Sequence, residues 1–346
     1  MSSEISAPKE AAASTARSRL GHLMGVQVVG VGSFVPENLV RNDDLARLGY
    51  DADWIVQRTG ILERRHALPE IATGDLAVEA ARRCIENANV DPQDIDLVLL
   101  GTFTPDMPLP ATSTLVQDRL GLRAPALDLQ AACASFIFAM LTGMQYVATG
   151  CSRLVLVIGA DCNSRVVNPA DQRTYPIFGD GAGAVLLAPG SAEQGLLGFA
   201  IGADGSGTNL LCRKMGGSRM PFNYNPSSNG LHYMYMDGRA IFKWAINMLR
   251  ETTADVLQYA GMTMDDVDLA IFHQANMRII NSAVKDLGID PAKVFNNLQR
   301  YGNTSSGSIP LALDEAYRQG RIDRGNHILF SGFGAGLAWG TVLMRW

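Results

Sequence analysis

A cysteine, a histidine and an asparagine that lie far apart in the sequence each stand in a context that suits acyl transfer. Cys133 follows the apolar and small residues Asp128-Leu-Gln-Ala-Ala, where a helix is expected to begin. At such a junction the helix dipole favours a thiolate, and a tight turn exposes the sulfur. A buried, inert thiol is the alternative, and it is the interpretation for the remaining cysteines, Cys84, Cys151, Cys162 and Cys212.

His273 follows the apolar run Ala270-Ile-Phe, and Asn303 lies in the run Tyr301-Gly-Asn-Thr-Ser-Ser-Gly-Ser. Catalytic groups gather at the carboxyl ends of strands in α/β folds, which favours a working role for the imidazole. A structural histidine is the alternative. The asparagine run could be no more than a capped helix start, or it could direct the Asn amide into a site as a hydrogen-bond donor.

Two glycine-rich segments, Phe178-Gly-Asp-Gly-Ala-Gly-Ala and Gly332-Phe-Gly-Ala-Gly, do not fit the phosphate-binding patterns. Glycine at these places would instead allow close approach of the backbone, or direct an N–H group at an oxyanion.

The elements that must position these residues alternate between short β-branched runs and helical stretches, which indicates an α/β fold with helices on both faces of the sheets. The segment from Asp91 resembles the segment from Thr263, with Asp96 matching Asp268, and Gly159 finds a counterpart in Gly332. These offsets predict two duplicated halves, 26–195 and 196–346, whose equivalent strand ends meet near a pseudo-twofold axis. Chance similarity of amphipathic units is the alternative.

The composition limits the classes of function. The chain has 346 residues, 47% hydrophobic and 18% charged, and a formal charge of −5, which excludes a broad basic field for nucleic acid. No stretch approaches the roughly 20 apolar residues of a membrane span. Five cysteines without a CxxC pattern argue against a disulfide framework or a zinc site and favour a cytoplasmic protein. Residues 1–25 are expected to be a disordered leader.

Taken in order, these motifs resemble the β-ketoacyl-acyl carrier protein synthase III family of the thiolase superfamily. The resemblance runs from about Val26 to Trp346, and its pieces are Asp53-Trp-Ile-Val-Gln-Arg-Thr-Gly-Ile, Ala131-Ala-Cys-Ala, the segment from Phe178, His273-Gln-Ala-Asn-Met-Arg-Ile-Ile, Gly302-Asn-Thr-Ser and Trp339-Gly. It implies a five-layered αβαβα thiolase-like fold, a homodimer, and no cofactor. The implied reaction condenses a short acyl-coenzyme A, such as acetyl-coenzyme A, with malonyl-acyl carrier protein and so initiates fatty acid synthesis.

The resemblance also implies roles for individual residues. Cys133 would carry the acyl group, while His273 and Asn303 would stabilise the enolate formed by decarboxylation, without a metal. The backbone N–H groups of Cys133 and Ala335 would form a second oxyanion hole, with alanine where the family usually has glycine.

The resemblance also implies which residues bind the substrates. For coenzyme A they are Trp54, Arg58, Asn276 and Arg173. The arginine that closes the adenine clamp in the family falls here on Gln172, so Arg173 beside it is the candidate. The acyl pocket would include Phe178 and, across the dimer interface, Leu109. The docking patch for the acidic carrier protein would consist of Lys243, Arg278 and Lys285, with Asp286 where some members have a basic residue.

The sequence leaves two alternatives to this function. The leader and Gln172 leave room for a condensing enzyme or acyltransferase of a specialised-metabolite pathway with an unusual acyl donor. A non-catalytic subunit that only binds carrier protein is a third reading, against which the intact set of Cys133, His273 and Asn303 argues.

Overall fold

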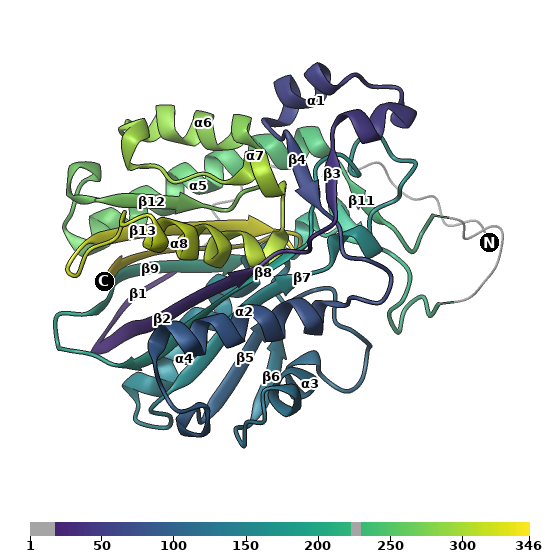
Figure 1. Ribbon diagram of the computed structural model, residues 1–346. Coiled ribbons are helices and arrows are strands. Elements are labelled where there is room, and N and C mark those ends of the chain that lie inside the picture. Colours follow the sequence, from purple (N-terminus) through teal and green to yellow (C-terminus); the bar gives the residue numbers. More distant parts are fainter. Residues whose placement is uncertain (1–17, 223–229) are drawn as a thin grey trace, which may run out of the picture.

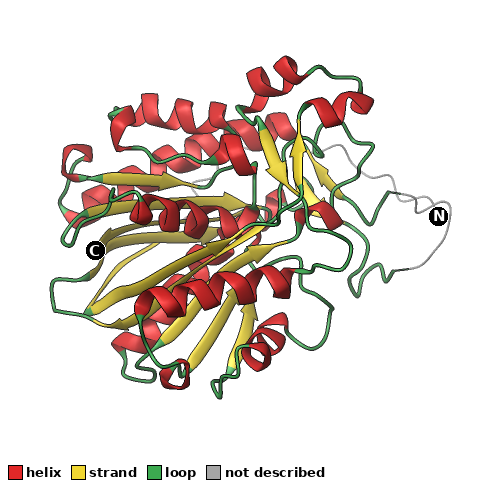
Figure 2. Ribbon diagram, viewed as in Figure 1, coloured by secondary structure: helices red, strands yellow, loops and turns green. Residues whose placement is uncertain are grey.

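The protein is described by a computed structural model that covers residues 18–222 and 230–346. Two five-stranded sheets lie one above the other with helices between and outside them (Figure 1), and Figure 2 shows the alternation of strands and helices.

The first sheet belongs to the N-terminal half of the chain. Its strand order is β2 (Val26–Phe34), β8 (Gly181–Pro189), β7 (Val155–Asp161), β5 (Leu97–Gly101) and β6 (Ala126–Leu129). The second sheet has the order β1 (Arg19–Met24), β9 (Gly195–Ala203), β14 (Ala338–Arg345), β13 (His327–Gly334) and β12 (Leu269–Phe272). The series β2-β8-β7-β5 and β9-β14-β13-β12 have the same directions, because β5–β7 and β12–β13 are parallel and the other pairs are antiparallel.

The duplication extends to single residues. Asp96 precedes β5 and accepts a hydrogen bond from the Arg153 backbone nitrogen at 2.7 Å. Asp268 precedes β12 and accepts one from the His327 backbone nitrogen at 2.8 Å. Both carboxylates hold the start of a strand beside its parallel neighbour. The predicted origin of the fold from two duplicated halves is therefore confirmed, whereas the bounds 26–195 and 196–346 stay predictions.

The layers follow from the patterns of the helices. α4 (Ser135–Ala148) is apolar on nearly every side and packs between the sheets, together with α8 (Ser308–Arg318). α2 (Thr73–Ala88) and α3 (Thr112–Arg119) cover the outer face of the first sheet. α5 (Gly238–Ala260) and α6 (Met277–Leu287) cover the outer face of the second. The five-layered αβαβα arrangement predicted from the sequence is confirmed.

The prediction of a disordered leader over residues 1–25 is wrong for its last part, and residues 1–17 lie outside the described residues. Arg19–Met24 forms β1, which pairs with β9 in antiparallel register. The indole N–H of Trp339 on β14 donates to the Ser18 hydroxyl at 2.9 Å. The sequence does not reveal β1 because it is a short edge strand with no buried residue, so it has no long apolar run.

Smaller elements gather at one end of the two sheets (Figure 1). They are β3 (Leu39–Arg41), α1 (Ala52–Thr59), β4 (Glu63–Arg65), β10 (Leu211–Arg213), β11 (Met234–Met236) and α7 (Leu298–Tyr301). No described helix is long and apolar enough to cross a membrane.

Candidate active site

Cys133 lies at a tight turn between a strand and a helix, as the sequence predicted. β6 leads into the short 3₁₀ helix Ala132–Ala134, and α4 follows directly. Ala132 has a φ of +48°, a left-handed conformation that strains a residue with a Cβ. Its carbonyl accepts hydrogen bonds from the hydroxyl groups of Ser135, at 2.5 Å, and Ser306, at 3.0 Å. These bonds hold the strained turn, which we call the elbow (residues 131–134).

The expectation that the thiol is exposed and ionised is wrong. Cys133 is only 7% exposed, and burial raises the pKa of its thiol to about 12, although a hydrogen bond from the Ser305 side chain acts in the opposite direction. The desolvation of the sulfur therefore acts against the stabilisation of the thiolate that is expected from the start of α4. Cys133 rests as a thiol and must lose its proton as it reacts.

The backbone nitrogen of Cys133 lies beside the end of β13. A Cβ built on Gly334 would stand 2.7 Å from this nitrogen, so only glycine permits the approach. Ala335, the predicted second oxyanion donor, is the next residue after β13. The two predicted N–H donors therefore stand close together in the fold.

His273 follows β12 directly, and its backbone nitrogen donates to the Ser331 carbonyl at 2.8 Å. The ring packs edge-on against Phe333, with centroids 5.3 Å apart. Its Nδ1 lies 2.7 Å from the Ser308 hydroxyl, which leaves Nε2 available to a substrate. Burial lowers the pKa of His273 to about 3, so the imidazole is neutral near pH 7.

Hydrogen bonds hold Asn303 through its backbone and through the oxygen of its side-chain amide. Its backbone donates to the Ile177 carbonyl at 2.9 Å and accepts from Gly179 at 3.0 Å, which pairs it with Phe178. Its Oδ1 accepts a hydrogen bond from the Ser305 backbone nitrogen at 2.8 Å. The side chain thus caps the following turn through Oδ1, which leaves Nδ2 available to donate elsewhere. The role of this amide as a donor to the substrate stays a prediction.

The fold brings these groups to one place. The elbow contacts both β13 and the 3₁₀ helix Ser305–Gly307, which follows Asn303. His273 is joined to the same region through Ser308, the first residue of α8. Phe178 is buried beside Asn303, as an acyl-pocket residue would be.

Trp54 and Arg58 lie on α1, four residues apart, and the guanidinium carbon of Arg58 stands 5.7 Å from the centre of the Trp54 ring. Trp54 also has an aromatic neighbour, Tyr50. The two rings are stacked, with centroids 3.8 Å apart and an angle of 5° between their planes. Asn276 caps α6 through the Arg278 nitrogen and donates to the Arg58 carbonyl at 3.2 Å. Asn276 therefore joins α1 to α6 and positions the Trp54 side of the site.

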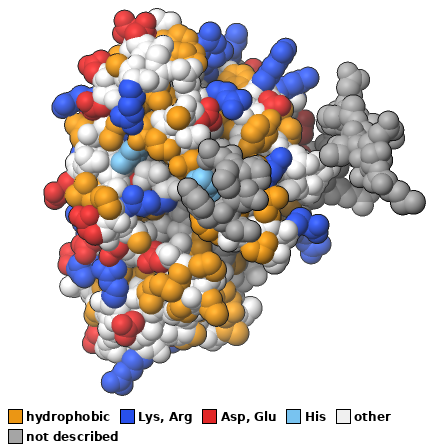
Figure 3. Space-filling view, turned by 90° about the vertical axis from the view of Figure 1, so that its right-hand side faces the viewer, with side chains coloured by type: hydrophobic (Ala, Val, Ile, Leu, Met, Phe, Trp, Pro, Cys, Tyr) orange, Lys and Arg blue, Asp and Glu red, His pale blue; other side chains and the backbone are white. Residues whose placement is uncertain are grey.

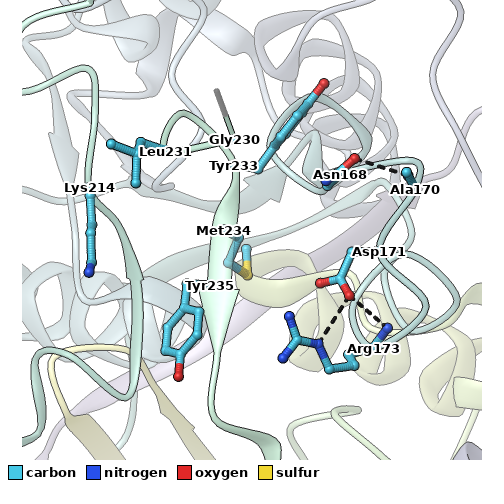
Figure 4. A pocket seen from close by; sticks show the side chains of 10 residues that line it. All are labelled: Asn168, Ala170, Asp171, Arg173, Lys214, Gly230, Leu231, Tyr233, Met234 and Tyr235. Atoms are coloured by element: carbon cyan, nitrogen blue, oxygen red, sulfur yellow. Dashed lines mark hydrogen bonds and ion pairs between the residues drawn. The ribbon is translucent and has the colours of Figure 1, made fainter. Parts of the chain in front are cut away.

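Gln172 and Arg173 do not close a clamp over Trp54 in this structure. The Gln172 amide donates to the Leu48 carbonyl, and the exposed Arg173 pairs with Asp171 at 3.2 Å. Arg173 lies in a cavity of about 350 Å³ whose lining also includes Lys214, Tyr233 and Tyr235 (Figure 4).

Leu109 does not reach the site of its own chain, because its side chain is 84% exposed. The loop that carries it is held firmly at both ends. Asp106 accepts from the Gly74 nitrogen at 2.7 Å, and its own nitrogen donates to the Thr112 hydroxyl at 2.8 Å. Asp128 accepts from the Thr112 nitrogen at 2.8 Å. A rigid loop that presents an apolar side chain to solvent is suited to insertion into another surface.

The predicted docking residues form an exposed basic group on two neighbouring helices. Lys243 lies on α5, and Arg278 and Lys285 lie on α6. The helices are joined where the Arg278 guanidinium stands 5.5 Å from the ring centre of Phe242. Basic side chains also gather toward the top of the face shown in Figure 3, while a broad hydrophobic patch lies lower on it.

Several residues around the site were not predicted from the sequence. Ser308 orients the imidazole, Ser306 holds the elbow, and the fully buried carboxylate of Asp161 accepts a hydrogen bond from the Ser306 backbone nitrogen. The run of serines after Asn303 was the one available signal for the first two. In the described parts of the chain, no group of three or more His, Cys, Asp or Glu side chains is placed to hold a metal ion.

Comparison with known proteins gives a consistent set of relatives. The family model 3-oxoacyl-[acyl-carrier-protein (ACP)] synthase III matches residues 127–205, and the model of its C-terminal part matches residues 257–346. A β-ketoacyl-[acyl-carrier-protein] synthase III of Rhodopirellula baltica is 52% identical over 94% of this chain and 100% of its own.

Solved structures agree with these matches. The 3-oxoacyl-[acyl-carrier-protein] synthase III of Aquifex aeolicus is 38% identical, with a TM-score of 0.86 over 93% of this chain and 100% of its own. The priming β-ketosynthase of the R1128 polyketide pathway is 35% identical, with a TM-score of 0.87 over 94% of this chain and 98% of its own.

Proposed function

The chain belongs to the β-ketoacyl-[acyl-carrier-protein] synthase III family, and from that membership we propose that it condenses a short acyl-coenzyme A with malonyl-acyl carrier protein on Cys133. It is a condensing acyltransferase that initiates fatty acid synthesis. The observation that carries the residue assignments is the convergence of a buried thiol, a neutral imidazole and a fixed Asn amide at one place.

In the first half-reaction the Cys133 sulfur attacks the thioester carbonyl of the donor. A carbon–sulfur bond forms to Cys133, the bond to coenzyme A breaks, and the thiol proton leaves with coenzyme A. Because burial keeps Cys133 protonated at rest, loss of the proton must accompany attack. The N–H groups of Cys133 and Ala335 stabilise the developing oxyanion.

In the second half-reaction the malonyl group loses carbon dioxide, and the resulting enolate attacks the acyl-cysteine. The Cys133 sulfur leaves and takes up a proton, which restores the thiol. A neutral donor is required where the enolate oxygen becomes negative. Nε2 of His273 and Nδ2 of Asn303 supply two such donors, each worth about 3 kcal/mol in the transition state.

The substrates have separate binding surfaces in this proposal. Trp54, Arg58 and Asn276 hold the nucleotide end of the donor, with Arg173 as a further candidate from the cavity of Figure 4. Lys243, Arg278 and Lys285 attract the acidic carrier protein, which a protein with a formal charge of −5 would otherwise repel. Phe178 lines the acyl pocket, and Leu109 of a second copy completes it in a homodimer. The cytoplasmic location remains a prediction.

A role in a specialised-metabolite pathway is the second candidate. The likeness to a priming ketosynthase of a polyketide pathway supports it, and so does the absence of an arginine at position 172. In that case the same residues act, but on a different acyl donor.

Intact-mass measurement of the protein after incubation with a panel of acyl-coenzyme A donors tests the proposal. We expect one acyl group per chain, lost in Cys133→Ala, with acetyl-coenzyme A among the fastest donors. Preference for a long or branched donor over acetyl would favour the specialised pathway. A wild-type protein that gains no acyl mass with any donor would contradict the assignment of Cys133.

A further inference from the structure

Asp161 is a fully buried carboxylate at the end of β7, and the mechanism above gives it no part. Its Oδ1 accepts hydrogen bonds from the hydroxyl groups of Thr102, at 2.9 Å, and Thr104, at 2.8 Å. The same oxygen accepts from the backbone nitrogens of Phe103, at 3.0 Å, and Thr104, at 3.2 Å. Its Oδ2 accepts from the backbone nitrogen of Ser306 at 2.9 Å. Burial raises the pKa of Asp161, whereas the hydrogen bonds from Ser306, Phe103 and Thr104 act in the opposite direction. Backbone N–H groups can only donate, so these hydrogen bonds favour the ionised carboxylate against the effect of burial.

These hydrogen bonds join segments that carry different parts of the site. Thr102–Thr104 leads into the loop that presents Leu109, and Ser306 lies three residues after Asn303. The Ser306 hydroxyl donates in turn to the Ala132 carbonyl at 3.0 Å, next to Cys133. One buried carboxylate therefore holds Ser306 of the asparagine loop, and Ser306 in turn joins that loop to the elbow, which comes from the other half of the fold.

We propose that Asp161 is a positioning residue for both half-reactions, which fixes the loop of Asn303 directly and, through Ser306, the spacing of that loop from the elbow of Cys133. The inference rests on the roles proposed above for Cys133 and Asn303. Burying a charge is costly unless hydrogen bonds satisfy it, and apolar contacts could fill the same volume. Hydrogen bonds have direction, however, so they can fix a spacing that close packing alone leaves looser. A misplacement of about 1 Å can cost roughly 100-fold in rate.

The charge of Asp161 also acts on Cys133 and, like burial, raises the pKa of the thiol. This gives the inference a second readout, which a purely structural role would not move. A neutral group of the same shape should lower the pKa of Cys133, so that iodoacetamide alkylates the thiol at lower pH.

Asp161→Asn is the central test. Four donors surround Oδ1, so the amide oxygen should keep that place and the NH₂ group should face the Ser306 nitrogen. The link to the asparagine loop would then break. We expect kcat for condensation to fall about 100-fold, with KM for malonyl-acyl carrier protein nearly unchanged. The alkylation profile of Cys133 should move to lower pH.

Two matched variants separate the causes. Ser306→Ala keeps the carboxylate and its N–H donor but removes the bond to Ala132, so it should lower kcat less and leave the alkylation profile in place. Asp314→Asn, on α8, neutralises another buried carboxylate, which bonds to Ser33 and Arg318. It should leave kcat and the profile unchanged.

A folded Asp161→Asn protein with the kcat of the wild type would overturn the proposal, and so would an equal loss of kcat in Asp314→Asn. If Asp161→Asn does not fold, Thr102→Val removes one donor to Oδ1 and should lower kcat without changing KM; an unchanged kcat would again overturn it. Failure of the wild type to acylate Cys133 would instead contradict the proposed function, and the alkylation profiles would still report on Asp161.

Discussion

Ser308→Ala is expected to slow decarboxylation selectively, because a Ser308 hydroxyl that donates to Nδ1 of His273 keeps the ring proton on Nε2. The pKa of His273 is about 3, so the ring is neutral near pH 7 and holds one proton. The Ser308 hydroxyl lies 2.7 Å from Nδ1. When it donates to Nδ1, the proton stays on Nε2, and only this tautomer can donate a hydrogen bond to the enolate oxygen.

The size of the effect follows from the single hydrogen bond that is lost. A neutral hydrogen bond contributes about 0.5–1.5 kcal/mol net. Each 1.36 kcal/mol of barrier changes a rate about tenfold, so decarboxylation should slow by roughly 2- to 13-fold. Acylation of Cys133 uses backbone N–H donors and should change little. Ser308→Thr keeps a hydroxyl at the same place and should restore most of the rate.

The assay measures carbon dioxide released from malonyl-acyl carrier protein by enzyme without an acyl group, beside acyl-Cys133 formation followed by intact mass. An unchanged decarboxylation rate in Ser308→Ala would refute the tautomer argument. Equal losses in both half-reactions would show instead that the substitution disturbs the whole site.

Three further predictions concern binding and pH. Stacking of a base on an aromatic ring contributes roughly 1–3 kcal/mol, so Trp54→Ala should weaken use of acyl-coenzyme A by about 5- to 160-fold without affecting malonyl-acyl carrier protein. Arg173→Ala should give the same selective defect in kcat/KM if Arg173 completes the clamp, and none if it does not. Lys243→Glu or Arg278→Glu should raise KM for malonyl-acyl carrier protein and leave acylation of Cys133 unchanged. Equal effects on condensation and on acylation would place the docking surface elsewhere. The pKa of His273 is 6.5 in the unfolded chain and about 3 in the folded protein, so the unfolded state binds more protons between these values and stability falls as the pH is lowered through them. At pH 5.5 the contribution of His273 to this loss is about 1.4 kcal/mol. Because burial also lowers the pKa of His66, urea titrations of His273→Gln should show a loss that is smaller than that of the wild type by about this amount.

Local patterns predicted much of the fold and the main chemistry of the site. The strand, turn and helix around Cys133 have a periodicity that changes within a few residues, and the structure follows it from β6 to α4. The matched aspartates Asp96 and Asp268 correctly predicted the duplication, because each has the same structural task beside a parallel strand. Such features depend on neighbours in sequence or on a repeat that can be compared within the chain.

The features that the sequence could not predict depend on contacts between distant segments. The raised pKa of Cys133 arises from burial by β13 and the loop after Asn303, and neither is visible from residues near position 133. Ser308 orients His273 across 35 positions of the chain. The exposure of the Leu109 side chain and the pairing of Arg173 with Asp171, away from Trp54, likewise depend on loop conformations. Loops vary more than the strands that they connect.

The comparison of the two halves explains how a duplicated fold produces one asymmetric site. Leu97 pairs with Val155 in one sheet and Leu269 pairs with Ile328 in the other, each directly after its matched aspartate. Counted along the strands from these pairs, Gly101 is the counterpart of His273, and Gly159 is the counterpart of Gly332. A Cβ on Gly101 would stand 2.8 Å from the Ser135 carbonyl carbon, so the first half needs glycine here to admit the start of α4. At the equivalent position of the second half stands the imidazole of His273. The same strand end therefore serves close packing in one half and chemistry in the other, which is why the nucleophile and its two donors come from different halves.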